Sequence, residues 1–121
     1  MSQLQVHISK QARTDVIDIL RYTEVRFGEG ACRRYQSLLQ NTFRSIGEES
    51  ERLGSVTREE ISPGLRSMHL FFSRLDNIEG RGVRPRHIVF YRSTEDQIVE
   101  VVRVLHDAME LTRQLGYLQK S

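Results

Sequence analysis

Charged and titratable side chains occur inside the most sheet-like stretch of this sequence, residues 86–111. The stretch reads RHIVFYRSTEDQIVEVVRVLHDAMEL, in which arginine and histidine interrupt runs of valine, isoleucine and leucine. A charge on an apolar strand costs free energy unless it is paired or faces a binding partner. Arginine is well suited to bidentate contacts with carboxylate or phosphate groups. Binding or chemistry is therefore expected at Arg86, His87, Arg92, Arg103 and His106.

Arg103 is the sharpest of these anomalies, because it interrupts the apolar run of residues 101–105. It must either form a structural ion pair, for example with Glu100, or open onto a face that is left bare for a ligand. Arg92, on the neighbouring predicted strand, poses the same alternatives. His106 follows at the end of the strand that carries Arg103, within reach of the same face. The sequence leaves both interpretations open.

The basic residues are almost all arginine, since only Lys10 and Lys120 of the 18 are lysine. Genome composition is one explanation, and recognition of carboxylate or phosphate is another. A local basic zone between residues 66 and 92 holds six arginines and two histidines against two acidic residues, although the formal net charge is only +2. The candidate residues for binding a partner or target are Arg81, Arg84, Arg86, His87, Arg92, Arg103 and His106.

The residue spacing gives no support to several other kinds of site. The four histidines are scattered singly and no HExxH or CxxC motif is present, so no metal site is predicted. No glycine-rich loop has the spacing of a nucleotide-binding motif. Cys32 is interpreted as an idle or buried cysteine, and Asp15 and Asp18 as part of a solvated helix face with local ion pairs. We predict no catalytic residue and no cofactor.

Two helices must position the candidate residues. Alternating apolar residues predict a short first strand over residues 4–8. Ser9 is then the predicted N-cap of a helix that Gly28 ends. A second amphipathic helix begins at residue 30 or 31 and ends at Gly47, so the two helices form an antiparallel hairpin. Two tyrosines are expected at the seam between these helices: Tyr22 and Tyr35.

Three further strands complete the predicted fold. They cover residues 65–73, 87–92 and 98–105, with loops over 47–64 and 74–84 and a tight link over 93–96. The last two strands are apolar on both faces, which is typical of central strands. The order β-α-α-β-β-β predicts an α+β fold in which a helical hairpin packs on a small, mostly antiparallel sheet. Residues 1–121 are expected to form a single domain.

The composition is that of a soluble globular protein, with 38% hydrophobic and 28% charged residues. No apolar run approaches the ~20 residues that a membrane span needs. The N-terminus lacks the basic and apolar blocks of a signal peptide. We therefore expect a cytoplasmic protein that does not associate with membranes.

The pattern HxxFYR at residues 87–92, followed by VxRVLHxxM at residues 101–109, resembles the C-terminal half of ParE toxins. These proteins belong to the RelE/ParE superfamily of bacterial type II toxin–antitoxin modules. The resemblance covers nearly the whole chain, although the 74–84 segment is longer than in the shortest members. The N-terminal half agrees at Ser9, Ala12, Asp15, Ile19, Tyr22, Phe27, Gly28, Ala31 and Tyr35, and the segment Leu65-Arg66-Ser67 fits as well.

The resemblance implies a toxin whose activity is not an enzymatic reaction. Its implied target is DNA gyrase, whose poisoning blocks replication. Its implied partner is a ParD-type antitoxin that wraps the toxin in a hetero-oligomeric complex and folds on binding. Direct sequence-specific DNA binding by the toxin alone is not expected.

The RelE branch of the superfamily offers a different activity, the cleavage of messenger RNA on the ribosome. That chemistry relies on basic side chains and, in many members, a C-terminal tyrosine. Here residues 107–110 follow His106 without that set, and Tyr117 is a weak substitute. The sequence therefore favours ParE-like gyrase inhibition. A RelE-like endoribonuclease that uses His87, Arg92, Arg103 and His106, or an inactive module that only binds an antitoxin, remain the alternatives.

Overall fold

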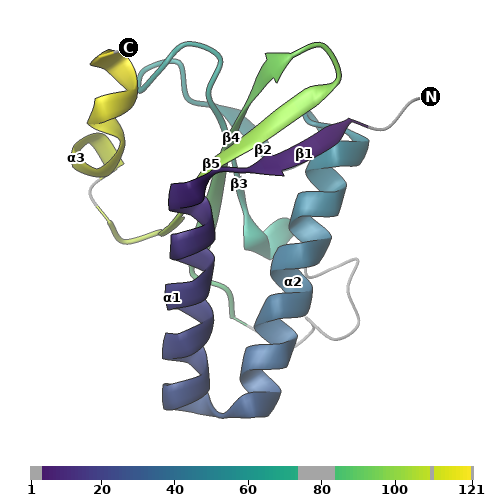
Figure 1. Cartoon of the computed structure of the whole chain (residues 1–121), viewed down its shortest axis with the longest axis vertical. Helices are drawn as coiled ribbons and strands as arrows, with labels where there is room; N and C mark the ends of the chain where they lie inside the picture. Colours follow the sequence, from purple (N-terminus) through teal and green to yellow (C-terminus); the bar gives the residue numbers. More distant parts are fainter. Residues whose placement is uncertain (1–3, 74–83, 110, 121) are drawn as a thin grey trace.

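The computed structural model describes residues 4–73, 84–109 and 111–120. It contains a helical hairpin, a five-stranded sheet and a short C-terminal helical segment (Figure 1). The elements are β1 (Gln5–Ile8), α1 (Lys10–Phe27), α2 (Glu29–Glu48), β2 (Ser55–Thr57), β3 (Arg66–His69), the 3₁₀ turn η1 (Leu70–Ser73), β4 (His87–Glu95), β5 (Ile98–His106), α3 (Leu111–Leu115) and the 3₁₀ turn η3 (Gly116–Lys120).

The sheet has the strand order β1-β5-β4-β3-β2. β1 runs parallel to β5, and the other three pairings are antiparallel. The predicted α+β class and the mostly antiparallel sheet are confirmed, and so is the central position of β4 and β5. The link between these two strands is shorter than predicted, because β4 continues to Glu95 and only Asp96 and Gln97 form the turn. Gln97 has a φ of +68°, which a tight turn requires and a side chain tolerates at some cost.

The helical hairpin begins at the predicted cap and turns at the predicted glycine, although α2 starts at Glu29, before the predicted residue 30 or 31. The Ser9 hydroxyl accepts a hydrogen bond from the Ala12 N–H at 3.0 Å and caps α1. Gly28, with a φ of +94°, ends α1 and directly precedes α2. The prediction that Gly47 ends α2 is wrong, because the helix continues to Glu48. Gly47 is buried and its carbonyl accepts a hydrogen bond from the Leu4 N–H at 2.8 Å, so it joins the helix to the strand β1.

Two predictions for the segment between the hairpin and β4 need correction. The predicted loop over 47–64 contains the three-residue strand β2, which pairs with β3. The predicted strand over 65–73 ends at His69, and residues 70–73 form the turn η1 instead. This turn places Leu70 in the core while Phe71 and Phe72 remain partly exposed.

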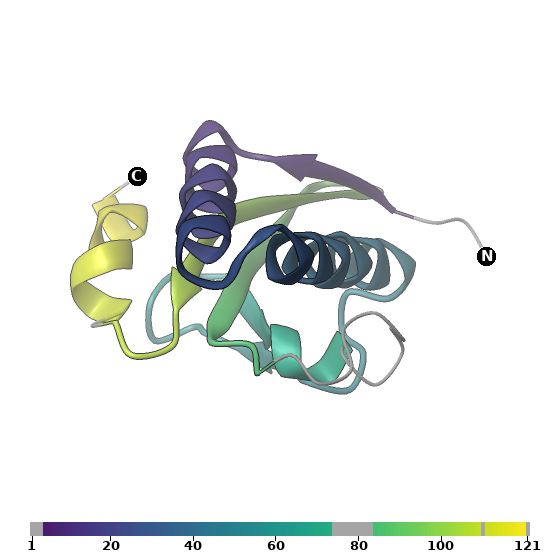
Figure 2. The ribbon, with the colours of Figure 1, turned by 90° about the horizontal axis from the view of Figure 1, so that it is seen from below.

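Two apolar clusters pack against the sheet. The first lies between the sheet and the hairpin and includes Leu38, Leu39, Val89, Tyr91 and Val101. The second joins the sheet to the C-terminal segment and includes Ile88, Phe90, Val102, Leu115 and Leu118. Figure 2 shows the C-terminal segment beside α1, on the side away from α2, and the Tyr117 hydroxyl lies 3.0 Å from Gln11 Oε1 of α1. β4 and β5 contribute to both clusters, because alternate residues of a strand point to opposite faces. Within the described residues, no helix is long and apolar enough to cross a membrane.

A candidate partner-binding pocket

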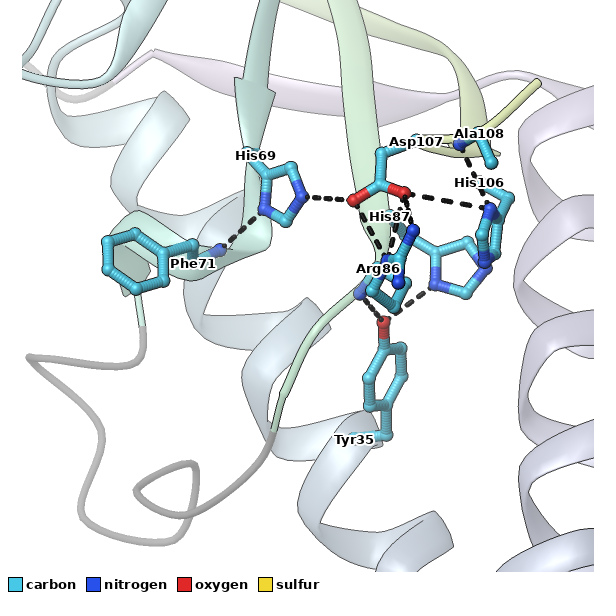
Figure 3. A network of polar contacts seen from close by, with 8 residues as sticks. All are labelled: Tyr35, His69, Phe71, Arg86, His87, His106, Asp107 and Ala108. Atoms are coloured by element: carbon cyan, nitrogen blue, oxygen red, sulfur yellow. Dashed lines mark hydrogen bonds and ion pairs between the residues drawn. The ribbon is translucent and has the colours of Figure 1, made fainter.

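Three titratable rings meet where β4 begins and β5 ends. His87 and His106 are direct partners in the antiparallel register of these strands. Their rings lie edge to face with centroids 5.3 Å apart. Tyr35 reaches from α2 to the same point, as Figure 3 shows, and its ring lies edge to face against His87 at 5.6 Å. The sheet register and the hairpin together therefore create a cluster that the sequence separates widely.

Tyr35 and His87 form a short, partly buried hydrogen bond of 2.6 Å between the tyrosine hydroxyl and Nδ1. The same hydroxyl accepts a hydrogen bond from the Arg86 backbone N–H at 3.1 Å. The hydroxyl therefore donates its hydrogen bond to His87 Nδ1, which is the unprotonated nitrogen of a neutral imidazole. Burial, followed by repulsion from His106, lowers the pKa of His87 to about 4. Burial also raises the pKa of Tyr35 to about 12, so both groups are uncharged near neutral pH.

The Asp107 carboxylate anchors the residues around this cluster. It accepts a hydrogen bond from Arg86 Nε at 3.0 Å and forms an ion pair with Arg86 Nη2 at 2.8 Å. On its other side it contacts His69 Nε2 at 2.9 Å. His69 Nδ1 accepts the Phe71 backbone N–H, so its proton must lie on Nε2, pointing to Asp107. The hydrogen bonds from Arg86 and His69 lower the pKa of Asp107 to about 2.

His106 is held in one orientation by the turn that follows β5. Its Nδ1 accepts the Ala108 backbone N–H at 3.1 Å, which places the ring proton on Nε2 (Figure 3). The His106 side chain is 38% exposed. Its imidazole is therefore accessible to solvent.

These residues form one side of an open pocket of about 570 Å³, which we call the hairpin pocket. The hairpin lines it with Tyr22, Thr23, Phe27, Ala31, Arg34 and Tyr35. The sheet side lines it with Arg84, Arg86, His87 and His106. The walls are mainly apolar and aromatic, and the arginines bring positive charge to them. An apolar cavity with a few polar groups is the usual form of a binding site.

The predicted position of Tyr22 at the helix seam is wrong, because 59% of its surface is exposed. It faces the Arg26 guanidinium at 5.9 Å instead and lines the hairpin pocket. Tyr35 is buried as expected, but its hydroxyl is directed toward the sheet rather than along the seam. Periodicity placed both tyrosines on inward faces and could not show that only Tyr35 contacts the sheet, whereas Tyr22 is exposed.

Arg103 forms a bidentate ion pair with Asp15, not with Glu100. Its Nε and Nη2 atoms lie 2.7 and 3.0 Å from the two carboxylate oxygens. The Asp15 carboxylate also accepts the Val104 backbone N–H at 2.9 Å. Its hydrogen bond to Arg103 raises the pKa of that guanidinium further. The prediction that Asp15 belongs to a solvated face is therefore wrong.

The position of Asp15 follows from the short length of β1. β1 pairs with β5 only as far as Ile8, opposite Val101. Beyond that point, residues at the start of α1 form the hydrogen bonds along the edge of β5. The Ser9 N–H donates to the Val101 carbonyl and the Ser9 hydroxyl to the Val102 carbonyl, while the Asp15 carboxylate accepts the Val104 N–H. Arg103 is thus one partner of an ion pair that joins α1 to the sheet.

The structure brings together four of the seven predicted site residues, Arg84, Arg86, His87 and His106. Arg103 is engaged by Asp15, and Arg92 lies 3.9 Å from Glu100 on the neighbouring strand. Arg81 and most of the predicted 74–84 loop lie outside the described residues. Sequence reasoning missed Tyr35 and Asp107 as members of the site. The sequence offered one signal for Asp107, namely a carboxylate that directly follows a basic strand end at His106.

No metal or thiol chemistry emerges from the geometry. Among residues 4–73, 84–109 and 111–120, no group of three or more His, Cys, Asp or Glu side chains is placed to hold a metal ion. Cys32 is partly buried, and its Sγ lies 3.5 Å from the Leu20 carbonyl oxygen. This contact is structural and connects α2 to α1.

Comparison with known proteins agrees with this architecture. Residues 6–111 match the family described as ParE toxin of the type II toxin–antitoxin system parDE. The chain belongs to the ParE toxin family. The family resemblance inferred from the sequence pattern is thereby confirmed. Toxin ParE1 of Caulobacter vibrioides is 31% identical over 109 residues, and the alignment covers 90% of this chain and 95% of that relative.

Two solved structures share the ParE-family fold. The chromosomal ParDE system of P. aeruginosa gives a TM-score of 0.62 at 15% identity and covers 86% of this chain and 96% of that one. The RelBE2 toxin–antitoxin complex of Mycobacterium tuberculosis gives a TM-score of 0.56 at 20% identity, with coverages of 90% and 97%. At these identities the likeness concerns the fold alone. ParE-like and RelE-like proteins thus share this arrangement of hairpin and sheet.

Proposed function

We propose that this ParE-family toxin inhibits DNA gyrase in the cytoplasm and is neutralised by a ParD-type antitoxin. The observation that carries the proposal is the family match over residues 6–111. The similarity to Toxin ParE1 also extends over most of both chains, 90% of this one and 95% of that relative. The toxin–antitoxin systems among the solved structures with this fold support a protein antitoxin as the partner.

The chemistry of the hairpin pocket favours binding over catalysis. General acid–base catalysis works best with a pKa near the working pH. With a pKa of about 4, His87 is a neutral imidazole at neutral pH, so it lacks the imidazolium form that would act as an acid, and it is a weak base. The pKa of about 12 keeps Tyr35 protonated and unreactive. Arg86 is engaged by Asp107, which reduces its capacity to stabilise a phosphate. These properties fit a pocket that binds a partner.

Two assays on the intact protein test the proposal. Purified toxin added to gyrase and relaxed plasmid should block supercoiling at micromolar concentration. Induction of the toxin alone should arrest growth, and co-expression with the neighbouring reading frame should restore it. Unimpaired supercoiling by a toxin preparation that binds its antitoxin would refute gyrase as the target. Normal growth on induction of the toxin alone would instead indicate an inactive, antitoxin-binding module.

A RelE-like endoribonuclease is the second candidate, and one observation favours it. His106 is partly exposed, and it shares a pocket with His87, Tyr35 and the arginines Arg84 and Arg86. An imidazole beside guanidinium groups is a combination that can cleave a phosphodiester. Primer extension on translated messages after induction decides the question. Cuts at codon-linked positions that disappear in His106→Ala would establish the nuclease, and intact messages in growth-arrested cells would exclude it.

A further inference from the structure

The hairpin pocket combines an apolar interior with unneutralised positive charge. Phe27 is 65% exposed and Tyr22 is 59% exposed, although both are large aromatic residues that line it. Exposed aromatic side chains gathered around a cavity indicate an interaction site, because burying them against a partner is favourable. The neutral Tyr35–His87 pair forms the inner wall without adding charge.

The charge of the pocket comes from arginines on two sides. Arg34 on α2 and Arg84 before β4 are both exposed and line the pocket. Arg86 also lines it but is paired with Asp107. Within the described part of the chain, no acidic side chain lines the pocket and no ion pair engages Arg34 or Arg84. The complementary partner group is therefore an anion, such as a carboxylate, rather than a second cation.

We propose that the hairpin pocket binds an apolar side chain flanked by carboxylates, from an acidic segment of the neutralising antitoxin. The proposal rests on the proposed function, and it assigns to the antitoxin a place on this toxin. The apolar side chain contacts Phe27, Tyr22 and Tyr35, while the flanking carboxylates pair with Arg34 and Arg84. This charge complementarity selects an acidic peptide, because bidentate guanidinium–carboxylate pairs add direction to the apolar contact.

A nucleic acid is a poorer occupant of this pocket. Proteins bind nucleic acids mainly through many phosphate contacts along an extended basic surface. The chain has a net charge of only +2, and the ionised Asp107 lies beside the pocket and occupies Arg86. Two exposed arginines around an apolar cavity suit a short peptide motif better than a phosphate backbone.

Two matched pairs of exposed residues test the proposal without disturbing the core. Phe27→Ser removes an apolar wall of the pocket, and Val25→Ser is its control, because Val25 is 80% exposed on the same helix and does not line the pocket. Arg34→Glu reverses a pocket charge, and Arg33→Glu is its control, since Arg33 is an exposed neighbour outside the pocket. Thermal melting checks that all four variants remain folded.

The probe is the full-length antitoxin that restores growth in the co-expression assay. Isothermal titration should show at least a tenfold loss of affinity for Phe27→Ser and Arg34→Glu, and less than a threefold loss for each control. The affinity of the unaltered toxin should also fall with added salt, and Arg34→Glu should reduce that dependence.

Each other outcome overturns the proposal in a different way. If no reading frame restores growth, the proposed function fails and this inference falls with it. If the antitoxin restores growth but binds both pocket variants with unchanged affinity, the hairpin pocket is not the antitoxin site, and the proposed function still stands. If Phe27→Ser lowers the affinity for the antitoxin and Arg34→Glu does not, the pocket does not bind carboxylates of the antitoxin. Binding of fluorescein-labelled single-stranded RNA that Phe27→Ser abolishes would assign the pocket to nucleic acid.

Discussion

The Asp15 carboxylate carries two connections at once, to the Arg103 guanidinium and to the Val104 N–H. The Asp15 and Arg103 side chains are only 13% and 17% exposed. If a substitution removed one of them, water could not easily supply the lost hydrogen bonds to the other. Asp15→Ala should therefore lower the free energy of unfolding by about 3 kcal/mol, because it leaves a partly buried charge and a backbone donor without their acceptor. Urea denaturation measures this change.

A double-mutant cycle separates the ion pair from the rest of the effect. Arg103→Ala and the double variant should give a coupling energy of about 1–3 kcal/mol with Asp15→Ala. Asp18→Ala is the control, since Asp18 is exposed on the same helix. A coupling energy near zero would show that Asp15 acts only on the backbone of β5, and would leave Arg103 free to serve a partner.

His87 makes the stability of the protein depend on pH. Its pKa is about 4 in the folded state against an ordinary value of 6.5, so the unfolded chain binds more protons between these values. The contribution is fully present above pH 6.5 and is lost as the pH falls toward 4. The shift from 6.5 to about 4 corresponds to about 3.5 kcal/mol at full effect, at about 1.4 kcal/mol per pKa unit. We expect a loss of about 2 kcal/mol between pH 7.0 and 4.5, because the full effect is reached only below the folded-state pKa.

Urea denaturation at pH 7.0, 5.5 and 4.5 measures this dependence. In His87→Gln the additional slope should disappear, while His7→Gln, an exposed histidine on β1, should retain it. Asp107 does not affect this measurement. Its pKa is lowered from 3.8 to about 2, so its contribution to the free energy of unfolding is lost only below the pH range that is measured. An unchanged slope in His87→Gln would mean that the imidazole is protonated within the fold.

At the scale of single residues, the sequence could show which side chains were anomalous but not what they contact. Arg103 stands out in any apolar strand, yet its partner lies 88 residues earlier in the chain. Asp15 has the spacing of an ordinary solvated helix residue. The end of β1 and the Ser9 cap were predicted, but the burial of Asp15 depends on α1 packing against the edge of β5, which no local pattern encodes. Tyr35 is similar, since its hydroxyl meets His87 only after the hairpin has packed on the sheet.

Among the elements, the turn before β2 depends on a glycine and on its neighbour in η1. Gly54 has a φ of +98°, and a Cβ built there would lie 2.5 Å from the Phe72 ring. Gly64 also has a positive φ of +77°, but a Cβ there would meet nothing within 4 Å. Gly54→Ala should therefore destabilise the fold by about 2–4 kcal/mol, through backbone strain and overpacking together. Gly64→Ala should cost only the backbone strain, about 1 kcal/mol.

Chemical denaturation of both variants measures the difference between them. The double variant Gly54→Ala/Phe72→Ala should recover the steric part, because Phe72 is partly exposed and its loss is mild. Equal losses for Gly54→Ala and Gly64→Ala would contradict the steric contact.

The strand β2 in the same region is an element that the sequence could not predict. The hairpin, β4 and β5 have long apolar patterns with clear caps, and their positions were predicted to within a few residues. β2 has only three residues, Ser55–Thr57, and is too short for a period of two to be recognised. Its place depends on long-range contacts instead, in which Tyr91 hydrogen-bonds to Ser55 and to the Ser50 carbonyl.

In the molecule as a whole, β4 and β5 join the two apolar clusters into one unit. Val89 and Tyr91 face the hairpin, whereas Ile88 and Phe90 face the C-terminal segment. Neither cluster can lose its packing without exposing one face of the same two strands. We therefore expect a single cooperative unfolding transition for the intact chain.

One substitution in each cluster tests this expectation. Leu39 in the hairpin cluster and Leu115 in the C-terminal cluster are 1% and 0% exposed. Leu39→Ala and Leu115→Ala should each lower the free energy of unfolding by about 3 kcal/mol, because each leaves a cavity in a packed cluster. Their effects should add to within about 0.5 kcal/mol, since the residues lie on opposite faces of the sheet. Arg113→Ala, an exposed residue on α3, is the matched control for the C-terminal segment.

Circular dichroism and tyrosine fluorescence should report coincident transitions in all of these variants. Tyr35 and Tyr91 respond to the hairpin cluster, and Tyr117, whose hydroxyl lies 3.0 Å from Gln11 Oε1, responds to the attachment of the C-terminal segment to α1. If Leu115→Ala released the C-terminal segment in a separate, earlier transition, the segment would be an appendage on a hairpin-and-sheet core. A single shared transition would instead show that the C-terminal segment, the sheet and the hairpin fold as one cooperative unit.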